Sequence, residues 1–215
     1  MSNDRTSAEV AAENERVRRM WDKTAPRYDK KISFWERRLF AGSREWVCSQ
    51  AKGDVLEVAI GTGRNLEYYP PDVRLTGVEF SPAMLEVARQ KAEDFGLQAD
   101  RRIGDAQALE FPDDPFDTVV VTIALCSIPD DQRAISEMKR VLRAGGRLVM
   151  FEHVGSSNRF IRGGQRVLEF FTIRLEGDYL TRQPIRPLRA EGFDLETVER
   201  SKAGIVERVV ARKPA

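Results

Sequence analysis

The stretch VLEVAIGTG, residues 55–63, decides the fold of this chain. Its first six residues form an apolar run interrupted only by Glu57, which is typical of a strand buried on both faces of a parallel sheet. Gly61 and Gly63 follow at once, and glycine permits a tight turn in which a ligand can approach the main chain. Ligands of such sheets bind at the carboxyl ends of the strands, so this turn is a candidate ligand site.

The same alternation of apolar runs and helical patterns continues after this turn. We predict a helix after the turn, through about residue 69, a second helix that ends near Gly96, and a third over residues 130–142. The strands that alternate with them are predicted at residues 74–80, 97–103, 116–125 and 147–154. Residues 193–199 and 205–212 are predicted to form an antiparallel hairpin. The pattern therefore predicts an α/β fold with a doubly wound, mostly parallel sheet and a terminal hairpin.

Helices are also predicted before the first strand. The patterns favour one helix over residues 8–20 and a second over residues 32–51, with a break at Ala25 and Pro26. The break is expected because proline lacks the amide hydrogen that a helix interior requires.

Composition limits the classes of function. The 215 residues fit a single α/β domain, and the 35 basic against 34 acidic residues disfavour nucleic acid as a partner. Cys48 and Cys126 are predicted to be buried thiols of a reducing compartment, and one histidine without a Cys/His cluster predicts no metal site. The polar N-terminus and the lack of a long apolar run favour a cytoplasmic protein. These features leave the oligomeric state open.

An acid at the end of the second predicted strand adds to the ligand site. The carboxylate of Glu79 can accept hydrogen bonds from both hydroxyls of a ribose. The same arrangement describes a nicotinamide dinucleotide site, but Leu66 occupies the position where the pyrophosphate fingerprint requires a third small residue. A tight turn without any ligand is the remaining structural alternative.

Four segments resemble, in order, the motifs of class I S-adenosylmethionine-dependent methyltransferases. VLEVAIGTG is similar to their E-x-G-x-G-x-G motif, with Ala59 in place of the first glycine. LTGVEFSPAML (75–85), GDAQALEFPDDPFD (104–117) and VLRAGGRLVMFEHV (141–154) resemble the next three motifs. The resemblance implies a Rossmann-like, seven-stranded sheet and S-adenosylmethionine as the cofactor.

The resemblance also implies roles for individual residues. Glu79 would bind the ribose, Asp105 would accept a hydrogen bond from the adenine amino group, and Met84 would lie near the adenine ring. The full set of residues expected at the cofactor is Tyr28, Glu57, Ala59, Gly61, Gly63, Glu79, Phe80, Met84, Asp105, Ala106 and Thr122.

Two residues are candidates for catalysis. The segment WDKTAPRYD (21–29) resembles the N-terminal part of small-molecule methyltransferases, in which a tyrosine closes over the cofactor, and Tyr28 occupies that position. Simple packing of Tyr28 under the first helix is the alternative. His153 ends the fifth predicted strand and is a candidate general base, with an ordinary core or rim histidine as the alternative.

The segment RFIRGGQRVLEFFTIRL (159–175) combines apolar residues with four arginines. We predict that it covers the substrate pocket. The alternatives are a helix that packs on the domain and a segment that makes a weak contact with a membrane surface. Gly163 and Gly164 are expected to interrupt helicity.

These observations predict one methyltransferase domain over residues 1–215. It would comprise an N-terminal helical lid (1–52), a cofactor-binding core (53–154), and a substrate cover with the terminal hairpin (155–215).

The predicted activity is in-line transfer of a methyl group to sulfur, oxygen or nitrogen of a small, hydrophobic or aromatic acceptor. Finer resemblance extends to thiol S-methyltransferases, phospholipid N-methyltransferases and quinone C-methyltransferases. The thiol S-methyltransferases commonly have a Cys-His pair before the stretch that contains Thr181 and Arg182 here, and this chain lacks that pair. The alternatives are C-methylation of a quinone-type ring, a nicotinamide-dependent oxidoreductase, and a non-catalytic regulatory protein that binds the cofactor.

Overall fold

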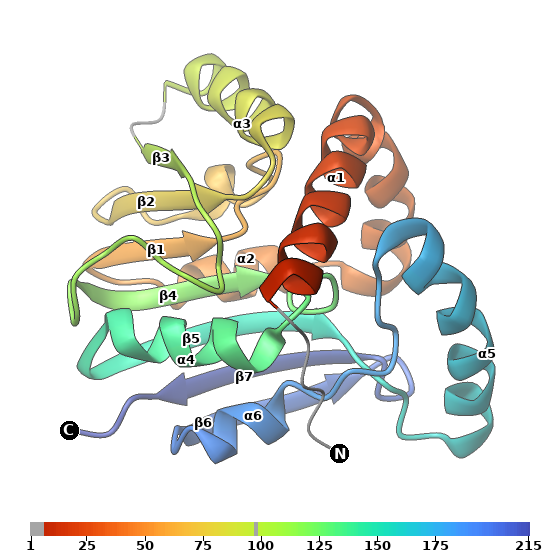
Figure 1. Cartoon of the computed structure of the whole chain (residues 1–215). Coiled ribbons are helices and arrows are strands. Elements are labelled where there is room, and N and C mark those ends of the chain that lie inside the picture. The colour runs from red at the N-terminus through yellow and green to blue at the C-terminus, as the bar shows by residue number, and fades with distance from the viewer. Residues whose placement is uncertain (1–6, 97–98) are drawn as a thin grey trace.

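A seven-stranded sheet forms the centre of the protein, as the sequence predicts (Figure 1). The computed structural model describes residues 7–96 and 99–215. Strand order is β3-β2-β1-β4-β5-β7-β6. Strands β1 to β5 run parallel, and β7 pairs antiparallel with both β5 and β6. The strands are β1 Asp54–Val58, β2 Arg74–Glu79, β3 Asp100–Ile103, β4 Phe116–Thr122, β5 Leu142–His153, β6 Asp194–Ser201 and β7 Val206–Arg212.

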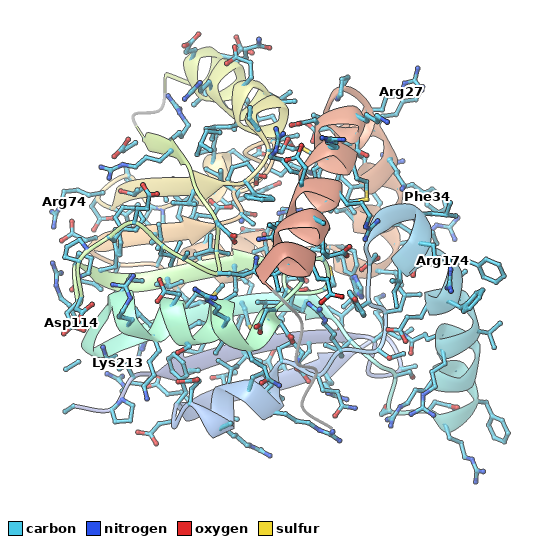
Figure 2. All side chains as sticks on the ribbon, viewed as in Figure 1. Arg27, Phe34, Arg74, Asp114, Arg174 and Lys213 are labelled. Atoms are coloured by element: carbon cyan, nitrogen blue, oxygen red, sulfur yellow. The ribbon has the colours of Figure 1, made fainter. Side chains whose placement is uncertain are left out.

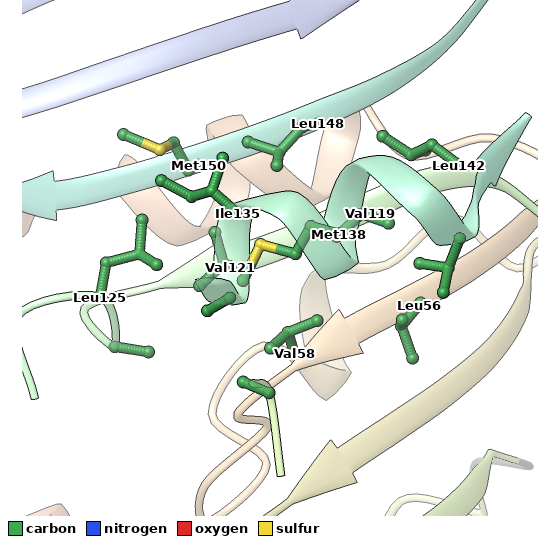
Figure 3. Close-up of a cluster of buried hydrophobic side chains, with 14 of the residues drawn as sticks. Leu56, Val58, Val119, Val121, Leu125, Ile135, Met138, Leu142, Leu148 and Met150 are labelled. Atoms are coloured by element: carbon green, nitrogen blue, oxygen red, sulfur yellow. The ribbon is translucent and has the colours of Figure 1, made fainter. Parts of the chain in front are cut away.

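Helices cover both faces of this sheet. They are α1 Ser7–Trp35, α2 Ser43–Ser49, α3 Pro82–Asp94, α4 Asp131–Val141, α5 Arg159–Glu176 and α6 Ile185–Ala190. Alternate side chains of each central strand point to opposite faces. Leu56 and Val119 join the cluster that contains α4 residues (Figure 3), whereas Val55 and Val120 pack with α2 residues. The strands are therefore apolar throughout because each of them is buried twice.

The predicted break at Ala25 and Pro26 is wrong, because α1 continues through both residues to Trp35. Proline removes only one backbone hydrogen bond, and the buried Ala25 is held by packing while the Thr24 hydroxyl donates to the carbonyl of Met20 at 2.9 Å. The predicted helix at 32–51 is also wrong as a single element. A π-helical turn, Glu36–Phe40, and a bend separate α1 from α2.

Two further local predictions are wrong. The chain after Gly63 forms turns and a short 3₁₀ helix, Leu66–Tyr68, instead of a regular helix, because the buried Asn65 side chain ties it to the sheet. Helix α5 runs unbroken through Gly163 and Gly164. Each glycine costs about 1 kcal/mol relative to alanine in a helix, which tertiary context and a good cap tolerate.

Both cysteines are buried free thiols, as predicted. The strand predicted at residues 97–103 is seen from Asp100 onward, and residues 97 and 98 lie outside the described part. Within the ranges that the structure describes, no helix has the length and apolarity needed to cross a membrane.

Candidate active site

A cavity lies at the carboxyl ends of β1, β2 and β4, and residues of α1 contribute to its lining. In Figure 1, α1 runs across these strand ends. The space inside the cavity is about 830 Å³ when the part open to solvent is included. The strand ends, the loops that follow them and α1 all contribute to its lining, which consists of Val17, Trp21, Tyr28, Arg44, Ala59, Ile60, Gly61, Thr62, Arg64, Val78, Glu79, Phe80, Met84, Gly104, Asp105, Ala106, Gln107, Thr122, Ile123, Ala124, Ser127, Ile128 and Pro129.

The turn after β1 presents its main chain to this cavity. Gly61 has a φ of +58°, and a Cβ added there would meet only the carbonyl oxygen of Ala59, 3.9 Å away. Gly63 serves a different purpose, because a Cβ there would lie 2.6 Å from Cδ1 of Leu66. Gly63 is absent from the cavity lining, so it permits close packing behind the turn, whereas Gly61 leaves open space in front of it.

Glu79 ends β2 with its carboxylate at the cavity. Only 6% of its surface is exposed, and the carboxylate accepts hydrogen bonds from the backbone amides of Gly61 at 2.9 Å and Ser81 at 2.8 Å. Burial raises the pKa of Glu79, and the two amides oppose that rise by stabilising its charge. The carboxylate is thus held rigidly as a hydrogen-bond acceptor.

Asp105 is a second oriented acceptor, in the loop after β3. Its carboxylate accepts from the backbone amide of Gln107 at 2.9 Å, from the Gln107 side chain, and from Nδ2 of Asn14 at 3.1 Å. Asn14 belongs to α1, so this contact joins the helix to the rim of the cavity.

Glu57 lies behind the cavity and is not part of its lining. Its carboxylate accepts from Nδ2 of Asn65 at 2.8 Å and from the hydroxyl of Tyr69 at 2.9 Å. Burial raises the pKa of Glu57 to about 7. In this arrangement Glu57 anchors the segment that follows the glycine turn.

Comparison with known proteins identifies the family. Residues 56–150 match the family model described as "Methyltransferase domain". The chain is 33% identical to the ubiquinone/menaquinone biosynthesis C-methyltransferase UbiE of Geobacter sulfurreducens, over 79% of this chain and 69% of that one. It is 32% identical to the human thiol S-methyltransferase TMT1A, over 77% of this chain and 70% of that one. The chain belongs to the class I S-adenosylmethionine-dependent methyltransferases.

Other matches agree with this assignment at the level of domain and fold. The chain is 45% identical to a phosphatidylethanolamine N-methyltransferase of Cereibacter sphaeroides over 47% of this chain, and it spans about half (51%) of that protein. An S-adenosylmethionine-dependent methyltransferase of Thermotoga maritima superposes with a TM-score of 0.69 at 18% identity, covering 92% of this chain and 99% of that one. The family implies S-adenosylmethionine as methyl donor and decides against the nicotinamide alternative.

The cavity of this methyltransferase fits that cofactor. It offers open space at Gly61, a buried carboxylate acceptor at Glu79 and a second acceptor at Asp105. Nine of the residues expected at the cofactor are in the lining: Tyr28, Ala59, Gly61, Glu79, Phe80, Met84, Asp105, Ala106 and Thr122. The other two, Glu57 and Gly63, support the turn from behind.

Helix α1 is fastened over the cavity by polar contacts along its length. Besides Asn14, Asp22 accepts from the Ser81 hydroxyl at 2.6 Å, and Asp29 accepts from the Thr62 hydroxyl at 2.6 Å and from Nζ of Lys91 at 2.8 Å. These contacts reach the loops after β3, β2 and β1 in turn. The first 29 described residues of the methyltransferase therefore bridge the strand ends that surround the cavity.

Tyr28 lines the cavity from α1. Its ring meets that of Trp21 edge to face, with 5.8 Å between centroids. Burial raises the pKa of Tyr28 to about 12, so its hydroxyl remains protonated at neutral pH. The two interpretations of Tyr28 from the sequence were closure over the cofactor and simple packing at the first helix. In the structure the ring packs against Trp21 of α1 and also lines the cavity.

Sequence reasoning missed a group of charged residues beside the turn. Nη1 of Arg44 donates to Oδ1 of Asn65 at 2.8 Å and to the Thr122 hydroxyl at 3.1 Å, and its Nε donates to Glu36 at 2.5 Å. Arg64 also pairs with Glu36. No motif marks Arg44, because it comes from α2 and reaches the cavity only through the packing of that helix under the sheet.

Ile123 is another cavity residue that the sequence did not single out. It follows β4 and has a φ of +48°, which is rare for a β-branched side chain and costs about 1–3 kcal/mol. Its amide donates to the carbonyl of Phe151 at 3.0 Å, so the pairing with β5 holds it in this conformation. The cavity wall at Ile123 therefore carries backbone strain.

His153 ends β5 but is absent from the cavity lining. Its Nε2 lies 3.1 Å from Oδ1 of Asp178. Burial opposes charge on the imidazole, but the Asp178 carboxylate outweighs this effect, and the pKa of His153 is raised. Its role as a general base stays a prediction.

The segment predicted to cover the pocket forms α5, which contributes no residue to the cavity lining. Its side chains point outward over much of its length, as Arg174 does in Figure 2. Large apolar side chains are exposed along this helix: Phe160, Ile161, Val167, Leu168, Phe170, Phe171 and Leu175.

Proposed function

We propose that this methyltransferase transfers the methyl group of S-adenosylmethionine to sulfur, oxygen or nitrogen of a small hydrophobic acceptor. One observation carries the proposal. Beside the polar cofactor end, the lining is apolar, and none of the described lining residues is a histidine, lysine or cysteine. An acceptor that binds there must carry a nucleophile that reacts without a histidine or lysine as general base. The apolar wall consists of Val17, Trp21, Ile123, Ile128 and Pro129.

The polar end of the cavity is suited to hold the cofactor. Glu79 uses only part of its capacity on the amides of Gly61 and Ser81, because a carboxylate can accept about four hydrogen bonds, and the remaining positions would receive the ribose hydroxyls. Asp105 would accept from the adenine amino group beside Ala106 and Met84. The bound cofactor supplies an electrophilic methyl group on its sulfonium.

The protein's own contribution is alignment and exclusion of water. Displacement in line requires the nucleophile to be held about 3–3.5 Å from the methyl carbon. We assign the lid function of residues 1–52 chiefly to α1, because Val17, Trp21 and Tyr28 close the cavity from that helix. The neutral hydroxyl of Tyr28 can donate a hydrogen bond that orients the acceptor.

Charge near the turn favours an acceptor that reacts as an anion. The guanidinium groups of Arg44 and Arg64 both line the cavity beside the turn, where each pairs with Glu36. A thiol ionises near pH 8.5 without help, and a neighbouring guanidinium lowers that value. Among heteroatoms, sulfur therefore fits best, because an alcohol would need a base.

A quinone-type ring is the second candidate acceptor. The UbiE relative, named as a C-methyltransferase, is aligned with 79% of this chain, which is similar to the coverage by the thiol S-methyltransferase. A hydroquinone also brings its own acidic hydroxyl, so it too could react without a protein base. The two candidates differ in the atom that carries the methyl group in the product.

The test is transfer of an isotopically labelled methyl group to a panel of thiols, phenols, amines and demethylated quinones, with products identified by mass spectrometry. We expect methylated heteroatoms, and Tyr28→Phe should reduce turnover at least about tenfold. Tyr68→Phe is the matched control, since Tyr68 is outside the lining. A ring C-methyl product would establish the second candidate, and absence of any transfer despite cofactor binding would favour the non-catalytic alternative.

Residues 159–175 are proposed to contact a membrane surface weakly. Helix α5 combines its exposed apolar side chains with arginines, and Phe160 is 82% exposed. Arginine above aromatic rings suits the boundary between anionic headgroups and acyl chains, and Arg174 lies 3.8 Å from the ring centre of Phe170. Vesicles of phosphatidylglycerol should sediment the protein and vesicles of phosphatidylcholine should not. Equal sedimentation of the Phe160→Asp/Phe170→Asp double variant would refute this contact.

A further inference from the structure

Three side chains with metal-ligand chemistry meet next to the cavity. Cys126 follows β4, His153 ends β5, and Asp178 follows α5, yet one thiol sulfur, one imidazole nitrogen and one carboxylate oxygen all lie within 4.8 Å of one another. We propose that Cys126, His153 and Asp178 form a metal-ion site suited to zinc. The proposal is independent of which acceptor the enzyme methylates.

The chemistry of the donor atoms points to zinc. Sulfur, imidazole nitrogen and carboxylate oxygen together are the ligand set of tetrahedral zinc sites, whereas calcium and magnesium prefer oxygen alone. Zinc bonds of about 2.0–2.3 Å place neighbouring ligand atoms roughly 3–4 Å apart. Nε2 of His153 and Oδ1 of Asp178 are already 3.1 Å apart, so only a small approach of the thiol completes this geometry.

Carboxylate oxygens without partners provide a second, independent observation. Oδ1 of Asp178 is buried and, although Nε2 of His153 lies 3.1 Å away, it accepts no hydrogen bond of good geometry from the described residues. Oε2 of Glu152 is also buried without a hydrogen-bond partner among the described residues; this side chain has no exposed surface, and its other oxygen accepts from the amides of Ala124 and Leu125. Native proteins rarely bury polar atoms unpaired, and a bound ion is one of the usual reasons for an exception.

The two described cations nearby are committed elsewhere. Nη2 of Arg16 lies close to Gly177, and this guanidinium pairs with Glu13 at 2.8 Å. Arg182 donates to the carbonyl oxygens of Leu125, Ile128 and Pro129, and its Nη1 lies 4.0 Å from Asp131. His153 is therefore the one basic group in the described cluster of Cys126, His153 and Asp178. A divalent cation would supply the missing positive charge.

Three protein ligands leave a fourth position for water or another exogenous group. Glu152 does not belong to the set of mutually close ligand atoms, so it would act on the site through its charge. Cys126 sits between Ala124 and Ser127, and both of these residues line the cavity. The metal would thus lie directly behind the wall of the proposed acceptor site.

Metal binding by the full chain tests this inference directly. The protein, made without a polyhistidine tag and stripped with a chelator, is titrated with Zn²⁺ and separately with Co²⁺. We expect one ion per chain and, with Co²⁺, a near-ultraviolet thiolate charge-transfer band. Cys126→Ser should remove the band and weaken Zn²⁺ binding at least about a hundredfold, which exceeds the loss usual for a second-shell change. Cys48→Ser, at the other buried thiol, should keep both.

Two further measurements separate metal binding from folding and from the proposed function. In the presence of chelator, the Cys126→Ser protein should melt at the same temperature as the metal-free parent protein. His153→Gln and Asp178→Asn should each weaken Zn²⁺ binding. Calorimetry with S-adenosylmethionine on the stripped parent reports on the cofactor site alone. Absence of stoichiometric Zn²⁺ binding, or equal binding by Cys126→Ser, would overturn the site while leaving the methyltransferase assignment intact.

Discussion

Replacing Glu79 by glutamine should weaken cofactor binding far more than the same replacement at Glu57. Glutamine keeps the shape of Glu79 but removes its charge and one accepting oxygen. The ribose would lose one charge-assisted hydrogen bond of about 1.5–3 kcal/mol, and the second would lose its charge assistance of about 1 kcal/mol, for about 2.5–4 kcal/mol together. At 1.4 kcal/mol per factor of ten, affinity should fall by a factor of roughly 10²–10³.

The structure of the apoprotein adds a second expected effect of Glu79→Gln. The amides of Gly61 and Ser81 both donate to the Glu79 carboxylate, and the glutamine amide can satisfy only one of them. One buried amide is then unpaired, which should lower the free energy of unfolding by about 1–3 kcal/mol. Binding must therefore be measured well below the melting temperature of the variant, by calorimetry with S-adenosylmethionine.

Glu57→Gln is the matched control for this experiment. Glu57 is equally buried and lies on the neighbouring strand, but its partners are Asn65 and Tyr69 and it is outside the cavity lining. Its affinity for S-adenosylmethionine should stay within about threefold of the parent, since no hydrogen bond to the ligand is lost. Wild-type affinity in Glu79→Gln, or an equal loss in both variants, would refute the division of roles drawn from the structure.

Three further predictions concern stability, each measured by urea or thermal unfolding. Ala59→Gly should stabilise the fold by about 0.5–1 kcal/mol, because Ala59 has a φ of +56° and glycine adopts this conformation without the cost of a Cβ; a loss of stability would show that the strain is absent. Burial raises the pKa of Glu152 from 4.5 to about 7, so the native state favours the protonated carboxyl. This preference stabilises the native state fully below about pH 4.5, and the stabilisation is lost as the pH rises through 7. Unfolding free energy of the metal-free protein should accordingly fall by about 1–3 kcal/mol between pH 5 and 7.5, and Glu152→Gln should flatten that slope; an unchanged slope would contradict the assignment. Ile135→Ala, in the core, should lower the free energy of unfolding by about 2–5 kcal/mol, whereas Phe160→Ala, on the exposed side of α5, should change it by no more than about 0.5 kcal/mol. Comparable losses in the two variants would mean that this side of α5 is buried.

Local sequence was sufficient to predict those features of the fold and the site that a single short segment determines. The buried run before Gly61 and the acid at Glu79 predict a strand, a turn and an acceptor at one sheet edge, because parallel strands bring their carboxyl ends together. The family motifs then imply the cofactor. The same reasoning failed at Pro26, where packing of α1 compensates for one missing hydrogen bond.

Local patterns also could not separate residues that face a ligand from residues that support them. Glu57 and Gly63 belong to the same motif as Gly61, yet side chains on a strand alternate between faces, and the turn has a front and a back. Only the packed structure assigns Gly61 to the cavity and the other two to its support.

The sequence by itself thus determined the sheet, its terminal hairpin, the methyltransferase family and the glycine turn. Tertiary structure alone decided which distant side chains meet. Arg44 reaches the cavity because α2 packs under the sheet, and Cys126, His153 and Asp178 converge although 27 and 25 positions separate them along the chain. Such meetings depend on how helices and loops pack across a sheet, and periodicity and short motifs carry information only about neighbours in sequence.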